Sequence, residues 1–162
     1  MLLVVIGIMV LGKKSASASA APPEATNFQC DISLQYAGMS LGGSISRPGP
    51  GHCTITLNDP ESLKGLCFDI ADGEIDISYG GLKLPIGSLD IPESNIMQPL
   101  CKALDTAASI ENLQIDRRDG NYVFYGPSTL SDFELLCSGD GRILKLALSK
   151  YELDIDFDNY KS

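Results

Sequence analysis

Tryptophan is absent from this chain of 162 residues, and histidine occurs once, at position 52. A single histidine leaves little material for histidine-based acid–base catalysis or for a histidine metal site. Positive charge is also scarce, because 12 lysine and arginine residues face 21 acidic ones and the formal net charge is −9. An acidic surface repels phosphate backbones, so we expect no nucleic-acid partner.

The chain also lacks an apolar run long enough for a membrane-spanning helix. The longest run, Met1 to Leu11, is too short for a bilayer of about 30 Å. The small-residue stretch SASASAAPPEAT follows it, and the combination is typical of an export signal, although no basic residue precedes the run. A membrane-associated anchor is the alternative. We expect a signal-like apolar segment over 1–18 and a flexible Ser/Ala/Pro spacer over 19–26. The protein would then be extracytoplasmic, at the cell surface or secreted, with its N-terminus near the membrane.

From position 27 onward, apolar and polar residues alternate in short segments. These segments are separated by glycine, proline, asparagine and aspartate, which predicts nine or ten antiparallel strands. The stretch from Arg47 to Gly51, RPGPG, predicts a firm break between two of them. Turns are expected at Asp72-Gly73 and at 118–121. Between these two turns, a short extended run is expected at Leu82 and Leu84.

One stretch in the middle of the chain changes period. Leu100, Cys101 and Leu104 follow helical spacing, which predicts one inserted helix over about 94–109. The fold class expected for the single domain, residues 27–162, is therefore α+β but mainly β. We expect a curved antiparallel sheet, an open half-barrel, whose concave face is covered by the helix.

A concave apolar face under a helix packs as an ordinary core or leaves a cavity for an apolar ligand. The residues that would line such a cavity share the apolar phase of a strand or the apolar face of the helix. They are Ile32, Leu34, Ile55, Leu57, Phe68, Ile77, Leu100, Leu104, Phe124, Phe133 and Leu135.

The five cysteines cannot all pair within one chain, and no CxxC spacing indicates a zinc site. Four of them lie in the apolar phase of their segments, as buried free thiols do. Cys67 alternates away from that phase. Mostly free core thiols and one or two disulfides both remain open.

Two motifs resemble catalytic or metal sites. Gly38 to Gly42 matches G-x-S-x-G around Ser40, but a nucleophile elbow needs a helix after the serine, and here a strand is expected. Asp154, Asp156 and Asp158 alternate along a strand, which is typical of a solvated face and not of a calcium loop. We therefore expect no enzyme, no catalytic residue, no metal and no cofactor.

The chain from Phe28 to Phe157 resembles small predicted lipoproteins of Gram-positive gut bacteria. The resemblance is carried by the mid-chain helix and by FQCDISLQYAGMSLGGSISRPGPGHCTITLNDPESLKGLCFDI and DISYGGLKLPI. That group is similar in strand order to the LolA/LolB and LppX/LprG-like carriers. The resemblance implies an unclosed β-barrel covered by helices, with acyl chains in its concavity. Such lipoproteins carry a cysteine after the apolar run, whereas here Gly12 is followed by Lys13.

Two functions are compatible with these patterns. The first is a monomeric, non-enzymatic envelope protein that binds or carries a lipid or another hydrophobic molecule in the cavity. The second is a cell-surface structural or interaction domain with a solid core and no small-molecule ligand.

Overall fold

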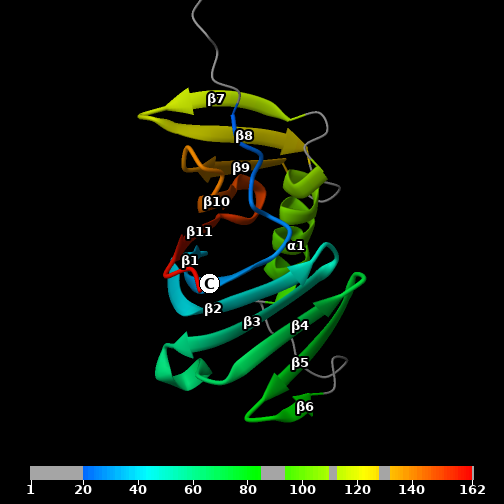
Figure 1. Cartoon of the computed structure of the whole chain (residues 1–162). Helices are drawn as coiled ribbons and strands as arrows, with labels where there is room; N and C mark the ends of the chain where they lie inside the picture. Colours follow the sequence, from blue (N-terminus) through cyan, green and yellow to red (C-terminus); the bar gives the residue numbers. More distant parts are fainter. Residues whose placement is uncertain (1–19, 85–93, 110–112, 128–131, 162) are drawn as a thin grey trace, which may run out of the picture.

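The computed structural model describes residues 20–84, 94–109, 113–127 and 132–161. Within these residues, eleven strands form a single antiparallel sheet that is not closed, accompanied by one α-helix (Figure 1). The strands are β1 (Phe28–Tyr36), β2 (Met39–Gly49), β3 (His52–Asp59), β4 (Leu66–Ala71), β5 (Glu74–Tyr79), β6 (Leu82–Leu84), β7 (Gln114–Arg118), β8 (Asn121–Pro127), β9 (Asp132–Cys137), β10 (Ile143–Leu148) and β11 (Leu153–Asp158). The helix is α1 (Ser94–Ser109), and two 3-10 turns are η1 (Glu61–Leu63) and η3 (Ser149–Tyr151).

The strand order is β6-β5-β4-β3-β2-β1-β11-β10-β9-β8-β7. Each half of the sheet is a run of sequential hairpins, and the two halves meet where β1 pairs with β11, with Leu34 opposite Ile155. Both edge strands, β6 and β7, are therefore the strands nearest to α1 in the sequence.

Two-residue turns fix the register of several hairpins. At Asp72-Gly73 and Asp119-Gly120 both residues of the pair have positive φ, between 52° and 91°. Positive φ at both positions produces the turn whose twist matches antiparallel strands, and Asp-Gly is a preferred pair for it. These two turns lie where the sequence predicts them.

Helix α1 lies across the strands and touches the sheet near both of the helix ends. Its closest backbone approaches to the sheet are to β4 at one end and to β8 and β9 at the other (Figure 1). At the β4 end, the Gln98 amide donates a 2.6 Å hydrogen bond to the Gly73 carbonyl. A flat stretch from β4 to β8 would span about 34 Å, whereas 16 helical residues span about 24 Å. The sheet must therefore curve around the helix.

The inner face of this curved sheet and the apolar face of α1 form one core. In β1, for example, Cys30, Ile32 and Leu34 are buried, while the alternate residues Gln29, Ser33 and Gln35 are exposed. The helix contributes Ile96, Met97, Leu100, Leu104 and neighbouring small residues to the same cluster.

The expected fold class is wrong as stated. Eleven strands in one sheet replace the nine or ten of the half-barrel, and the fold is mostly β with a single helix. The additional strand is β6, whose three residues pair with β5 through Tyr79 opposite Leu82 and Ile77 opposite Leu84. Three residues are too few for alternation to separate a strand from an extended loop. The curved antiparallel sheet and its single helix are the part of the expected fold that agrees with the structure.

The break expected at 47–51 is shorter than predicted. Strand β2 continues to Gly49, and Arg47 pairs with Phe28 at the start of β1. Pro48 lies just beyond that pair, so the missing proline N–H costs no ladder bond with β1. Arg47 therefore belongs to the sheet and continues the buried phase of Gly43 and Ile45.

Candidate functional site

All eleven residues that the sequence singles out lie in one place. Each is at most 4% exposed, and all belong to the cluster between the sheet and α1. Ile32, Leu34, Ile55, Leu57, Phe68 and Ile77 come from β1 to β5, Phe124, Phe133 and Leu135 come from β8 and β9, and Leu100 and Leu104 come from α1.

The central strands supply further core residues that were not singled out. Leu146 of β10 and Ile155 and Phe157 of β11 are buried in the same cluster. Their alternation with polar residues is the signal that could have included them. The position of these strands at the middle of the sheet follows from strand order, which alternation does not determine.

One hollow borders this core at the β8–β9 end of the sheet. It measures about 370 Å³ and is lined by Gln114, Tyr125, Gly126, Pro127, Asp132 and Phe133. That volume falls within the usual range of small-molecule sites, about 300–1,000 Å³. Phe133 belongs both to the hollow and to the buried cluster, so the hollow borders the apolar core at this side chain.

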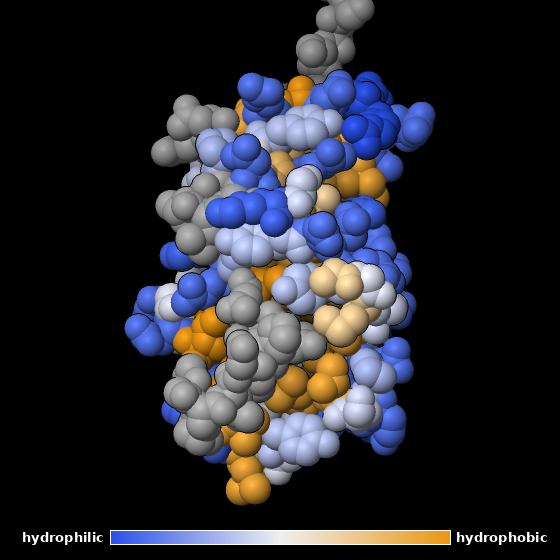
Figure 2. Space-filling view, turned by 180° about the vertical axis from the view of Figure 1, so that it is seen from behind, coloured by the Kyte–Doolittle hydropathy of each residue, from blue (hydrophilic) through white to orange (hydrophobic). Residues whose placement is uncertain are grey.

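A second hollow, of about 540 Å³, lies where the chain enters β1 and leaves β11. Its lining is rich in charge and includes Glu24, Arg142, Asp158 and Lys161. Apolar side chains reach the surface elsewhere, at the β5–β6 end, where Leu82 is 74% and Tyr79 46% exposed. Figure 2 shows the apolar surface of the back face gathered mainly in the lower half of the molecule.

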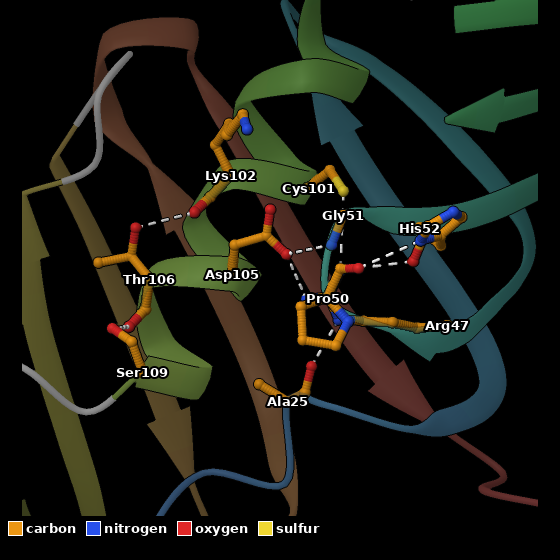
Figure 3. Close-up of polar contacts among 10 residues, drawn as sticks. All are labelled: Ala25, Arg47, Pro50, Gly51, His52, Cys101, Lys102, Asp105, Thr106 and Ser109. Atoms are coloured by element: carbon orange, nitrogen blue, oxygen red, sulfur yellow. Dashed lines mark hydrogen bonds and ion pairs between the residues drawn. The ribbon is translucent and has the colours of Figure 1, made fainter. Parts of the chain in front are cut away.

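A polar cluster interrupts the apolar interface between α1 and the sheet. Its centre is Arg47 of β2, which is completely buried. The guanidinium Nη2 donates to Asp105 Oδ1 on α1 at 2.5 Å, and Nε donates to the carbonyl oxygen of Ala25 (Figure 3). The amide of Gly51 also donates to Asp105 Oδ1, at 2.9 Å. One arginine thereby links the sheet to the helix and to the segment before β1.

Sequence reasoning missed Arg47, although a signal was present. Arg47 lies in phase with Leu41, Gly43 and Ile45, which all face inward. A charge can occupy such a position when an ion pair and several acceptors compensate its desolvation, and here Asp105 and the carbonyl groups do so.

The remaining nitrogen of the guanidinium faces two neighbours at once. Arg47 Nη1 donates to the carbonyl of His52 at 3.5 Å and to Cys101 Sγ at 3.6 Å. Cys101 lies on α1, and Cys53 follows His52 on β3. Hydrogen bonding between the two thiols is the largest influence on the pKa of each. It lowers the pKa of Cys101, as the Arg47 charge does, and raises the pKa of Cys53, which burial raises further.

The other cysteines agree with their phase in the sequence. Cys30 and Cys137 are buried and Cys67 is half-buried, and all five cysteines of the chain are free. Burial is the main reason why the pKa values of Cys30 and Cys137 rise to about 12. These two thiols are therefore protonated at neutral pH.

The two motifs set aside in the sequence lie in ordinary surroundings. Ser40 is exposed on β2, where its hydroxyl accepts a 2.8 Å hydrogen bond from Gln35 in the same hairpin. Asp154 on β11 forms an ion pair with Lys145 at 3.1 Å. Among the residues described, no group of three or more His, Cys, Asp or Glu side chains is placed to hold a metal ion. The described part of the chain likewise contains no helix that is long and apolar enough to span a membrane.

No family model matches the sequence, and no curated protein matches it. Solved structures to which this chain is similar include the following three. An uncharacterised conserved protein from Thermus thermophilus is 16% identical, with a TM-score of 0.49 over 85% of this chain and 79% of its own. A LolA superfamily protein from Nitrosomonas europaea is 11% identical, with a TM-score of 0.41 over 85% and 86%. A DUF1329 family protein from Desulfovibrio piger is 12% identical, with a TM-score of 0.34 over 83% of each chain.

Proposed function

We propose that this protein is a non-enzymatic, extracytoplasmic binder of a lipid or a comparable apolar molecule, held between the sheet and α1. One observation carries the proposal: within the described residues, a single helix covers the inner face of an eleven-stranded sheet and is tied to it through a buried polar cluster. A cover of this kind can move outward and expose apolar surface.

The way in which α1 contacts the sheet supports a movable cover. Its backbone approaches the flanking strands β4, β8 and β9 more closely than the central strands β1 and β11. Apolar side chains fill the space over those central strands. An acyl chain could replace the contacts of Leu100 and Leu104 there with contacts of the same chemical kind.

The chemistry of the lining indicates which part of a ligand enters. Among the described residues, no buried side-chain nitrogen or oxygen lacks a hydrogen-bond partner. A polar head group would therefore lose its hydration in the core without compensation. We expect the apolar part of the ligand to enter and the head group to stay at the hollow beside Phe133, where Gln114 and Asp132 are exposed.

A test is to substitute Leu104→Trp and measure the binding of cis-parinaric acid, a fluorescent fatty acid, to the delipidated full-length chain. Leu104 is fully buried between α1 and the sheet, so the larger ring occupies the space that the ligand needs. We expect the affinity to fall about tenfold or more, equivalent to about 1.4 kcal/mol, while circular dichroism stays unchanged.

The matched control is Leu82→Trp, since Leu82 is 74% exposed on β6 and lies outside the core. It should bind the fatty acid as the wild type does. Native mass spectrometry of the wild type, compared with a denatured sample, should show a lipid that is lost on unfolding. A bare mass, together with no fatty-acid binding and a Leu104→Trp variant destabilised by about 1–3 kcal/mol, would favour the solid-core interaction domain.

A further inference from the structure

Two cysteines from elements far apart in the sequence meet at the point where α1 is fastened to the sheet. Cys53 on β3 is 1% exposed and Cys101 on α1 is 3% exposed. Arg47 Nη1 bonds both Cys101 Sγ and the carbonyl of His52, the residue before Cys53, so the guanidinium brings the two segments together. Both cysteines belong to the one buried cluster between the sheet and α1, and each thiol shifts the pKa of the other. The other three cysteines lie outside this contact: Cys67 is on the opposite face of β4 from the core, and Cys30 and Cys137 are near Tyr160.

We infer that Cys53 and Cys101 form a reversible disulfide that fastens α1 to β3 and closes the proposed ligand site. The inference rests on the proposed function for its consequence, while the bond itself rests on the burial of both thiols at the Arg47 guanidinium, which joins their two segments. A covalent link at this position would keep Leu100 and Leu104, on the same helix, against the sheet.

The surroundings assign different parts to the two thiols. Arg47 Nη1 donates to Cys101 Sγ, as it would to a thiolate. The neighbouring Cys53 thiol and then Arg47 lower the pKa of Cys101, and together they outweigh burial and Asp105, which raise it, so Cys101 is the nucleophile. Cys53 remains protonated until its partner has reacted, and it is therefore the resolving thiol. The oxidant is a low-molecular-weight disulfide, which reaches the pair only when α1 lifts, because both sulfurs are buried.

The exchange balances in two steps. The Cys101 thiolate attacks one sulfur of the small disulfide, whose S–S bond breaks, and the released thiolate takes up the proton that Cys101 had lost. When α1 returns to the sheet, Cys53 gives up its proton and attacks the Cys101 sulfur. The Cys53–Cys101 bond forms and the second small thiol leaves with that proton. Two protein thiols are oxidised and one small disulfide is reduced to two thiols.

The test begins with the full-length chain in oxidised glutathione, followed by digestion on the N-terminal side of aspartate under non-reducing conditions. This cleavage places each of the five cysteines on a separate peptide, with Cys53 on 31–58 and Cys101 on 90–104. We expect these two peptides to be joined. Uptake of cis-parinaric acid should be about tenfold slower in the oxidised protein and should recover with dithiothreitol.

Matched variants separate this pair from the other thiols. In the Cys101→Ser variant, the two peptides should stay separate after oxidation, and uptake of cis-parinaric acid should not become slower. The Cys67→Ser variant should behave as the wild type does. The inference is overturned if the wild-type peptides stay separate or if Cys53 or Cys101 joins another cysteine instead. It is also overturned if the disulfide-linked protein takes up the fatty acid as fast as the protein with free thiols does.

A different result would count against the proposed function alone. If the reduced wild type takes up no fatty acid, the carrier proposal fails. The disulfide is then judged by the peptide map and by hydrogen exchange of the α1 amides. Exchange must slow in the joined protein if the bond fastens the helix, and unchanged exchange would refute the inference.

Discussion

Replacing Asp105 by alanine is expected to lower the free energy of unfolding by about 3–5 kcal/mol, because it leaves the buried Arg47 cation without its counterion. Arg47 is fully buried, so its charge cannot be hydrated again unless α1 separates from the sheet. The carbonyl groups of Ala25 and His52 remain as acceptors, but neither carries a formal charge. Urea denaturation of the full-length chain, followed by circular dichroism, measures the loss.

The opposite substitution, Arg47→Met, should cost less, about 2 kcal/mol. The side chain of Asp105 is 23% exposed and keeps its hydrogen bond from the Gly51 amide, so water can take over from the guanidinium. The double variant Asp105→Ala/Arg47→Met should be more stable than the sum of the two losses predicts.

An exposed ion pair provides the control for this cycle. Lys64 and Glu61 pair at 3.3 Å, and their side chains are 59% and 85% exposed. Glu61→Gln should therefore change stability by no more than about 0.5 kcal/mol. If Asp105→Ala cost as little as Glu61→Gln, or less than Arg47→Met, the cluster would not hold α1 on the sheet.

The second large effect is expected at Gly43 on β2, where Gly43→Ala should cost about 3 kcal/mol. A Cβ atom at this position would lie 2.4 Å from the carbonyl oxygen of Thr56 and 3.2 Å from the Cα of Leu57. Both are backbone atoms of β3, so no side chain can rotate away and the two strands must separate. The register between β2 and β3 also shifts between Gly42 and Gly43, as is typical of a glycine at a strand irregularity.

The matched substitution lies in the same strand. At Gly49 an added Cβ meets nothing within 4 Å, so Gly49→Ala should change stability by about 0.5 kcal/mol or less. Thermal and urea unfolding of both variants measures the difference. Equal losses would show that the close approach of β2 to β3 at Gly43 is relieved elsewhere at little cost.

Local patterns predict the local elements of this fold. Leu100, Cys101 and Leu104 repeat at helical spacing, and α1 occupies Ser94–Ser109. The Asp-Gly pairs form the expected turns because their conformational preference needs no distant partner. The pairing of β1 with β11 could not be predicted in this way, since alternation assigns residues to a face but says nothing of the neighbouring strand.

The site could be predicted only in its apolar part. Leu34 and Phe68 are buried as their phase indicates, whereas the burial of Arg47 depends on Asp105, 58 positions later. Cys53 and Cys101 were each assigned correctly to an apolar face, but no sequence rule brings the two faces together. Contacts between distant elements depend on how α1 lies on the sheet, and that is determined by the whole core.

The meeting of β1 and β11 also has a consequence for the kinetics of folding. Hairpins in each half of the sheet involve near neighbours in the sequence and can form early, but Leu34 must find Ile155 before the two halves become one. Strand β11, which is synthesised after every other strand of this sheet, thus occupies the centre of the sheet instead of an edge. Until residues 153–158 are available, a growing or clipped chain exposes two unpaired edges, at β1 and at β10, which makes these intermediates prone to aggregation.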